Sequence, residues 1–160
     1  MSGAIGSLCF TAKLRSPGNP MKHLLLPFDG SPSATRAARH AAELAALIPG
    51  LRVSLLHVFD PVTLAPHGAL VRHEVESRYG AAAAALMAPA VQVFESAGVS
   101  VELHCRAGAS ASEIAQYIHE AGCDAVVMGT RGMGPLAAIL IGSVATRVLQ
   151  TVDVPVTLVK

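Results

Sequence analysis

The sequence predicts a three-layer α/β protein, in which a doubly wound parallel sheet is covered by helices on both faces. Short apolar runs alternate along the chain with longer segments of helical periodicity, which implies a parallel sheet with right-handed crossovers. Several of these runs are continuously apolar, the pattern of strands buried on both faces. The chain has 160 residues, of which 52% are hydrophobic, enough for one sizeable core.

The first three elements are separated by clear turn signals. Residues 23–28 (HLLLPF) predict a buried strand, and the turn DGSP follows it. Ser31 is suited to cap the next helix, because Pro32 then takes the first helical position, where a missing N–H costs nothing. Small residues recur at helical spacing until Pro and Gly at 49–50 end the helix. Residues 52–59 (RVSLLHVF) predict the second strand.

The middle of the chain predicts a long helix, a strand and a shorter helix. The long helix spans about residues 74–97, and the alternating run 99–105 predicts the strand after it. Ser110 and Glu113 have capping-box spacing at the start of the shorter helix, and Gly122 is placed to end it.

A glycine interrupts the apolar stretch near the end of the chain. Residues 124–129 (DAVVMG) predict a fourth buried strand and 154–159 (VPVTLV) a fifth, with a short helix at 143–151 between them. Inside a helix, Gly142 costs about 1 kcal/mol relative to alanine. Two interpretations stay open: the helix begins after Gly142, or one helix runs over 135–150 with Gly142 as a packing residue.

Charge and cysteine content exclude several classes of partner and setting. Lys and Arg number 12 against 11 Asp and Glu, which gives neither the basic surface of a nucleic-acid binder nor an acidic tail. No apolar run reaches the roughly 18 residues of a membrane span. Three cysteines without a CxxC pair favour a reducing, cytoplasmic setting. We expect residues 1–20 to be a flexible extension and residues 21–160 to be the single domain.

The histidines and cysteines predict no metal site. His67 and His73 share a segment, but no carboxylate or cysteine stands at ligand spacing from them. We interpret His57 as a strand histidine whose ring is hydrogen-bonded inside the fold, and Cys105 and Cys123 as small buried residues.

The turns after the first and fourth strands are where a ligand is expected. In open α/β sheets ligands bind beyond the carboxyl ends of the strands, where the strand order reverses. Asp29 follows the first strand, and Gly129 ends the fourth. A glycine pattern begins at Gly129. Two residues separate Gly129 from Gly132, nine residues separate Gly132 from Gly142, and Ser143 follows directly.

This spacing, with the stretches PFDGS, LLHVFD, DAVVMG and VPVTLVK in the same order, resembles the universal stress protein family over residues 21–160. The resemblance implies a Rossmann-like, five-stranded sheet of strand order 3-2-1-4-5. That order puts the reversal between the first and fourth strands, beside Asp29 and Gly129.

The resemblance to the ATP-binding branch of the family also implies roles at the adenosine end of a nucleotide. Asp29 is expected to accept hydrogen bonds from the ribose hydroxyls. Val58 and Met128 are expected to line the adenine slot, and Pro27 to shape its wall. Gly129 is expected to lie against the ribose, where a side chain would block the ligand or a needed positive φ.

At the phosphate end, the resemblance implies contacts from Gly132, Gly142, Ser143 and the amide of Val144. A helix that starts near Gly142 presents unpaired N–H groups and the positive end of its dipole to an anion. Arg131 is the nearby cation, and Mg²⁺ or Mn²⁺ is a candidate companion of the nucleotide.

Simpler structural roles remain open for five of these residues. Val58 and Met128 are core residues first, and they would be apolar with or without adenine. Asp29 can be a residue that caps the first helix or shapes its turn, and Ser143 an N-cap of the last helix. Arg131 can be a solvated charge of its loop.

Three classes of function follow. The first, which we favour, is an adenine-nucleotide-binding regulatory module of the stress response, with no catalytic residue and at most slow ATP hydrolysis. The second is a nucleotide-free dimeric scaffold of the same fold. The third is an enzyme, but HxGH, SGGxDS and Walker A motifs are absent from the sequence. The edge strand 154–159 exposes unpaired backbone groups, so we expect a homodimer formed through it.

Overall fold

A computed structural model of the chain describes residues 21–59, 72–131 and 141–160, except for the side chains of residues 72–78. It confirms the predicted sheet, which is parallel throughout and has the order β3-β2-β1-β4-β5. The strands are β1 (His23–Pro27), β2 (Arg52–Phe59), β3 (Glu102–Ala107), β4 (Ala125–Gly129) and β5 (Val156–Val159). The described helices are α1 (Pro32–Leu47), α3 (Arg72–Ser96), α4 (Ser110–Ala121) and α5 (Ser143–Thr151).

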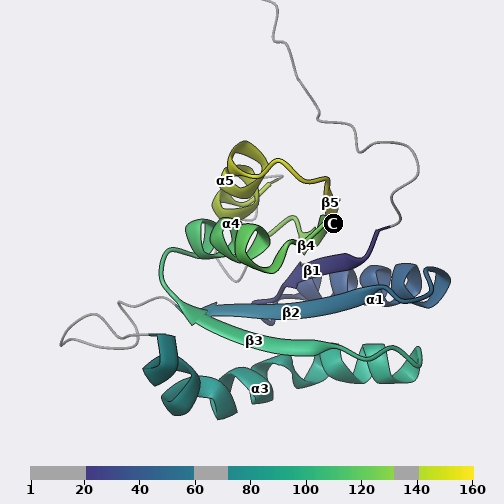
Figure 1. Cartoon of the computed structure of the whole chain (residues 1–160), viewed down its shortest axis with the longest axis horizontal. Coiled ribbons are helices and arrows are strands. Elements are labelled where there is room, and N and C mark those ends of the chain that lie inside the picture. Colours follow the sequence, from purple (N-terminus) through teal and green to yellow (C-terminus); the bar gives the residue numbers. More distant parts are fainter. Residues whose placement is uncertain (1–20, 60–71, 132–140) are drawn as a thin grey trace, which may run out of the picture.

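The helices cover both faces of the sheet, as expected for a doubly wound fold. In Figure 1, α3 lies below the sheet and α4 and α5 lie above it, while α1 lies behind β1 and β2. Leu24 and Leu26 of β1 point into the core shared with α1 and α3. Leu25 points into the second core, with α4 and α5. Burial on both faces explains why β1 reads as a continuous apolar run.

Helix α1 begins as predicted. Ser31 is its N-cap, and its hydroxyl oxygen accepts a hydrogen bond from the Ala34 amide at 3.2 Å. Pro32 takes the first helical position. The buried face of the helix is made almost entirely of alanines, which lets the helix axis come close to β1 and β4.

The predicted capping box of α4 is wrong. The N-cap is Ala109, without a side-chain cap, and Ser110 is the first helical residue. Glu113 instead lies with its Oε2 3.7 Å from Nη1 of the buried Arg106, so its carboxylate serves an ion pair. The predicted end of the helix is confirmed, because Gly122 is the C-cap with a left-handed φ of 63°.

Three strands begin later than the sequence pattern predicts, β4 by a single residue, at Ala125. The amide of Val99 donates to the carbonyl of Phe94 at 2.9 Å, which closes the turn after α3, so strand pairing starts only at Glu102. The last strand starts at Val156 because Pro155 has no N–H to offer a neighbouring strand.

Helix α5 begins after Gly142, which decides between the two interpretations of this stretch. Gly142 is its N-cap and has an extended backbone, with φ −69° and ψ 160°. A single helix running through Gly142 is therefore excluded. Residues 132–140 lie outside the described part of the chain.

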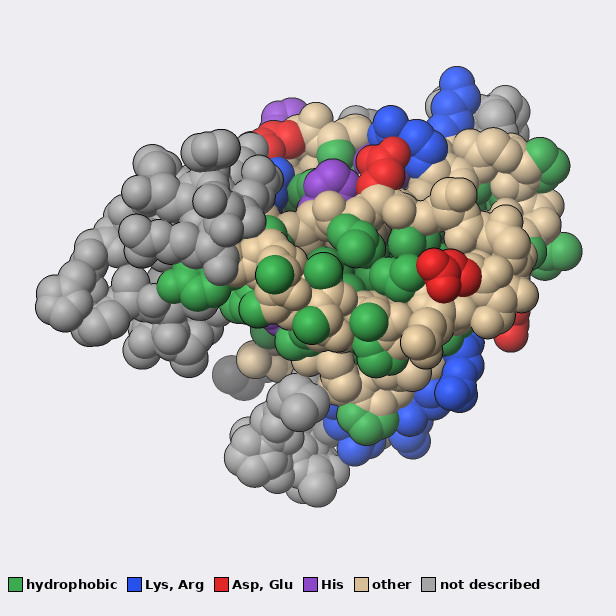
Figure 2. Space-filling model, turned by 90° about the horizontal axis from the view of Figure 1, so that it is seen from below, with side chains coloured by type: hydrophobic (Ala, Val, Ile, Leu, Met, Phe, Trp, Pro, Cys, Tyr) green, Lys and Arg blue, Asp and Glu red, His purple; other side chains and the backbone are tan. Residues whose placement is uncertain are grey.

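Helix α3 continues through Pro89 and carries no charged residue between Gly80 and Phe94. Figure 2 views the molecule from this side, and hydrophobic side chains occupy the centre of that face. The exposed alanines of the helix are Ala81, Ala82, Ala84, Ala85 and Ala88. Even so, no described helix combines the length and the apolar character needed to cross a membrane.

Candidate functional site

The candidate site lies at the carboxyl ends of β1, β2 and β4, together with the start of α5. The strand order reverses at β1, whose neighbours are β2 on one side and β4 on the other. Nine of the ten predicted site residues are described. Gly132, the tenth, lies outside the described residues.

The turn after β1 is built around Asp29. One carboxylate oxygen, Oδ1, accepts a hydrogen bond from the Ser31 amide at 3.0 Å, while the side chain remains half-buried. Gly30 follows with a φ of +81°, a conformation that L side chains rarely adopt. Asp29 therefore shapes its turn, and the bond to Ser31 fixes the direction of the carboxylate.

The residues predicted to face adenine differ in exposure. Pro27 is the buried last residue of β1. Val58 is half-buried near the end of β2. Met128 is only 5% exposed and packs with α4 and α5, so it is chiefly a core residue.

Gly129 lies against the first turn of α1. A Cβ on Gly129 would come within 2.6 Å of Ser33 Oγ and 2.8 Å of the Ala34 amide nitrogen. Its φ is not positive, so of the two reasons expected for a glycine here, the positive φ does not apply. The close approach of α1 is by itself a sufficient reason for glycine at this position.

The start of α5 presents uncapped backbone amides. Gly142 donates its own amide to the Thr130 carbonyl at 2.7 Å, and its carbonyl accepts the first helical bond, from the Thr146 amide at 3.0 Å. Among the described residues, no side chain caps the first turn. The N–H groups of Ser143 and Val144 precede that first bond, so they have no partner within the helix.

Ser143 is the first helical residue, so the alternative in which it is the N-cap is wrong. Its side chain and that of Val144 are exposed.

Two serine hydroxyls join α1 to the loop after β4. Ser31 Oγ donates to the carbonyl of Arg131 at 3.1 Å, and Ser33 Oγ makes a short hydrogen bond to the same oxygen. The Arg131 side chain is half-buried. The turn that carries Asp29 and the loop that carries Arg131 are thus brought together.

Sequence reasoning missed Ser33 and Thr130. Ser33 stands two residues after a capping serine, and a second small hydroxyl in a first helical turn was the available signal. Thr130 is 9% exposed, and its Oγ1 has no hydrogen-bond partner among the described residues. Nothing in the sequence pattern distinguishes this threonine from any other loop residue.

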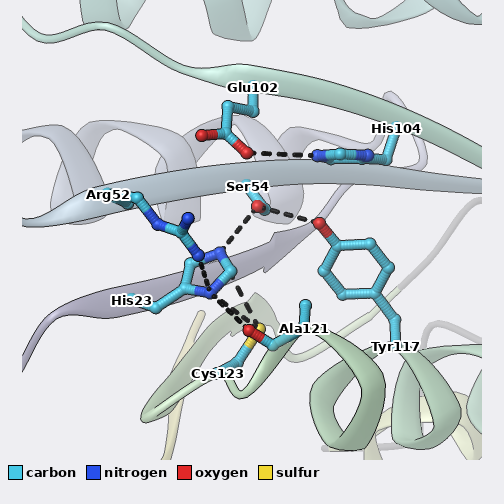
Figure 3. A network of polar contacts seen from close by, with 8 residues as sticks. All are labelled: His23, Arg52, Ser54, Glu102, His104, Tyr117, Ala121 and Cys123. Atoms are coloured by element: carbon cyan, nitrogen blue, oxygen red, sulfur yellow. Dashed lines mark hydrogen bonds and ion pairs between the residues drawn. The ribbon is translucent and has the colours of Figure 1, made fainter.

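A second polar cluster lies at the opposite, amino ends of the strands (Figure 3). His23, the first residue of β1, has Nε2 2.8 Å from Ser54 Oγ of β2. The hydroxyl of Tyr117, from α4, donates to the same oxygen at 2.9 Å. Arg52 Nη2 lies 2.9 Å and the Ala121 carbonyl 3.2 Å from His23 Nδ1. In a neutral imidazole, Nδ1 is either a donor or an acceptor. It can therefore make only one of these two hydrogen bonds, because the Arg52 N–H needs an acceptor and the Ala121 carbonyl needs a donor.

The start of β4 is tied to the same cluster. Asp124 Oδ2 accepts the amides of Lys22 at 2.7 Å and His23 at 3.0 Å. Cys123 Sγ lies 3.7 Å from His23 Nδ1.

Burial sets the protonation states in this cluster. Burial lowers the pKa of His23, with a further lowering by the Arg52 charge and an opposing effect from the hydrogen bond to Ala121. Burial also raises the pKa of Tyr117, and it raises that of Cys123 to about 11. At neutral pH the thiol is therefore protonated and unreactive.

Three smaller predictions have different outcomes. His57 is confirmed as a satisfied strand histidine, with Nδ1 2.8 Å from the Phe28 carbonyl. Cys105 and Cys123 are confirmed as buried. His67 and the side chain of His73 lie outside the described part of the chain. Within that part, no group of three His, Cys, Asp or Glu side chains is placed to hold a metal ion.

The fold and the site together define a doubly wound α/β protein with a candidate ligand crevice at its strand-order reversal. The family model of the universal stress proteins matches residues 20–160, and the chain belongs to this family. Universal stress protein MJ0531 of Methanocaldococcus jannaschii is 31% identical over 151 residues, which cover 92% of this chain and 86% of that protein.

Solved structures of relatives agree with this assignment. The protein MJ0577 is 27% identical, with a TM-score of 0.72 over 88% of this chain and 96% of its own. A universal stress protein from Archaeoglobus fulgidus, solved in complex with dAMP, is 25% identical, with a TM-score of 0.61 over 88% of this chain and 98% of its own.

Replacement of Gly129 by alanine should destabilise the fold without any ligand. The new Cβ meets the backbone of α1, which cannot move aside as a flexible side chain can, so we expect the free energy of unfolding to fall by about 1–3 kcal/mol. The matched control is Gly80→Ala in α3, where a Cβ meets nothing within 4 Å and stability should rise by about 0.5–1 kcal/mol. Urea unfolding measures both variants, and wild-type stability of Gly129→Ala would contradict the packing argument.

Stability should fall in mild acid because of His23. Its pKa in the folded state lies below the ordinary value of 6.5, so the unfolded chain binds more protons as the pH falls from 6.5 through the folded-state pKa. The His23 contribution is present above pH 6.5 and is lost through that window. We expect the melting temperature to drop less between pH 7.5 and pH 5 in His23→Gln than in the wild type.

The control for this experiment is His119→Gln, which removes an exposed histidine from the same side of the sheet. It should retain the wild-type pH dependence. An equal slope in wild type and His23→Gln would show that other groups cause the acid sensitivity.

Proposed function

We propose that this protein is an adenine-nucleotide-binding regulatory module of the stress response, with ATP as its first candidate ligand. The nucleotide binds at the carboxyl ends of β1 and β4, and its phosphates lie at the start of α5. The dAMP complex of the Archaeoglobus fulgidus relative supports an adenine nucleotide as the ligand class. The proposed setting is the cytoplasm.

The observation that carries this proposal is the start of α5. Within the described part of the chain its first turn has no side-chain cap, and the turn itself contains no acidic residue and is exposed. The bond from the Gly142 amide to the Thr130 carbonyl holds it beside the end of β4. Unpaired amides and the positive end of a helix dipole form a site for an anion. The carboxylate of Asp29 follows β1 at the same ends of the strands, and a vicinal diol is a suitable partner for it.

The proposed roles follow the course of the nucleotide. Pro27, Val58 and Met128 border the adenine, while Gly129 and the second carboxylate oxygen of Asp29 contact the ribose. The amides and hydroxyl near the start of α5 bind the phosphates. Ser143 and Val144 supply the amides for these contacts, while Gly142, whose own amide is bonded to the Thr130 carbonyl, lets the phosphate approach without a side chain. Gly132 is the proposed contact from the loop after β4, and Arg131 is the proposed cation. A Mg²⁺ or Mn²⁺ ion enters with the nucleotide, on its phosphate oxygens.

The amide contacts decide the affinity. Burial of about 150 Å² of adenine and ribose carbon contributes about 4 kcal/mol before the cost of association, which alone gives weak binding. Each further 1.4 kcal/mol strengthens binding about tenfold. Charge-assisted bonds from the α5 amides to phosphate supply this part.

The proposed activity is binding, with at most slow ATP hydrolysis. Asp29 is engaged by Ser31 and, in the proposed complex, by the ribose, so it is not assigned as a general base. A nucleotide-free dimeric scaffold of the same fold is the alternative function.

The C-terminal strand supports a second proposal, a homodimer. β5 pairs only with β4 among the described strands, which leaves its other edge without a partner there. On the neighbouring helix, Val144 and Leu149 are 38% and 42% exposed. Pairing of β5 with the same strand of a second copy covers the edge.

Gly142→Val should abolish most nucleotide binding and leave the fold intact. The extended backbone at Gly142 suits valine, so the loss of stability should not exceed about 1 kcal/mol. The valine side chain keeps phosphate away from the amides, and the ATP affinity measured by calorimetry should fall at least about tenfold. Thr151→Val, at the other end of α5, is the control and should bind as the wild type does.

The wild-type and Gly142→Val proteins purified for calorimetry can also identify the ligand. Denatured, freshly purified protein should release an adenine nucleotide that mass spectrometry detects, and Gly142→Val should release much less. Unchanged ATP affinity in Gly142→Val would contradict the proposed site. Absence of any affinity in the wild type would favour the scaffold function.

Thr157→Lys should weaken the proposed dimer. Thr157 is exposed on β5, and a lysine on an edge strand places charge where a second copy pairs. We expect the dimer dissociation constant, measured by light scattering, to rise at least about tenfold. Gln92→Lys, exposed on α3, is the charge-matched control, and a wild-type monomer at micromolar concentration would count against the dimer.

A further inference from the structure

Two buried serine hydroxyls converge on one backbone oxygen, the carbonyl of Arg131. Ser31 is 1% and Ser33 5% exposed, and both belong to the start of α1. The Ser31 hydroxyl also caps α1, because its oxygen accepts a hydrogen bond from the Ala34 amide. Among the described residues, Ser33 makes no capping bond, and its hydroxyl bonds the Arg131 carbonyl and Ser31 Oγ.

The backbone of residues 129–131 is held from both sides. On the α1 side, Ser33 bonds the Arg131 carbonyl and lies against the Cα of Gly129. On the other side, the Thr130 amide donates to the Val159 carbonyl at 2.8 Å, and the Thr130 carbonyl accepts the Gly142 amide at 2.7 Å. One short segment thus connects the start of α1 with the start of α5.

This connection fixes the spacing between the two halves of the candidate crevice. The Asp29 turn is attached to α1 through Ser31, and α5 is attached to residues 129–131 through Gly142. Loss of the Ser33 hydroxyl would leave the Arg131 carbonyl, in a half-buried place, with fewer donors. The segment would then be less restrained on the α1 side, and the start of α5 less well placed relative to Asp29.

We propose that Ser33 is a positioning residue that sets the start of α5 at the distance from Asp29 that a nucleoside polyphosphate requires. It acts through the Arg131 carbonyl and does not touch the ligand. The proposal rests on the proposed nucleotide-binding function and names a residue that this function does not include. It implies that Ser33 matters for ligands with phosphates and little for those without.

The test compares ATP and adenosine in calorimetry with wild type and Ser33→Ala. We expect the ATP affinity to fall about five- to tenfold, which corresponds to the net free energy of one hydrogen bond. The adenosine affinity should be nearly unchanged. Ser33→Thr retains a hydroxyl and should recover most of the ATP affinity. The matched control is Thr35→Val, because the Thr35 hydroxyl bonds the Ser31 carbonyl of its own turn and no other described residue.

A second readout does not depend on a ligand. Hydrogen exchange at the Gly142 amide reports the bond to the Thr130 carbonyl, and we expect faster exchange in Ser33→Ala with unchanged exchange in Thr35→Val. If wild type binds ATP, unchanged ATP affinity in Ser33→Ala, or an equal loss for ATP and adenosine, overturns the positioning role. If wild type binds no nucleotide, the proposed function fails, and unchanged Gly142 exchange in Ser33→Ala overturns the link between α1 and α5 by itself.

Discussion

The contact between the first turn of α1 and the last residue of β4 is the constraint on which the candidate site depends. It requires a residue without a side chain at position 129, and it brings two serine hydroxyls onto the carbonyl two residues further on. The backbone beyond β4 is thereby directed to α5. The arrangement of the candidate site is therefore set by packing within the protein and does not depend on a bound ligand.

Local rules predicted most of the architecture. Three features depend on residues that are close together in the sequence, so they can be predicted from it. They are the continuous apolar run of β1, the proline after a capping serine, and the left-handed Gly122. The sheet order came from a resemblance to a family, because pairing between distant strands leaves no local pattern. The capping box failed because the Glu113 carboxylate pairs with Arg106 of the preceding strand, a contact that the spacing of Ser110 and Glu113 does not reveal.

The sequence predicted which positions form the candidate site. For some of them it did not predict why that type of residue stands there. Gly129 was expected to make room for a ligand, and the structure gives it a packing reason in α1. Met128 is expected to be a core residue first as well as to line the slot, and its place in the core is confirmed. Ser33 has no spacing rule that identifies it, because its partner lies 98 residues away. Contacts across such separations depend on the finished topology.

Both ends of β4 are fixed by hydrogen bonds. Before the strand, Asp124 holds the amides of Lys22 and His23, and beyond it Arg131 is held by the serines of α1. A five-residue strand spans about 16 Å, with sheet neighbours on both sides. Such a segment has little freedom to bend, so it behaves as a rigid rod. The end of α4 lies just before this strand, where the Cys123 amide donates to the Ile118 carbonyl at 3.0 Å, so one short strand joins that helix to the candidate site.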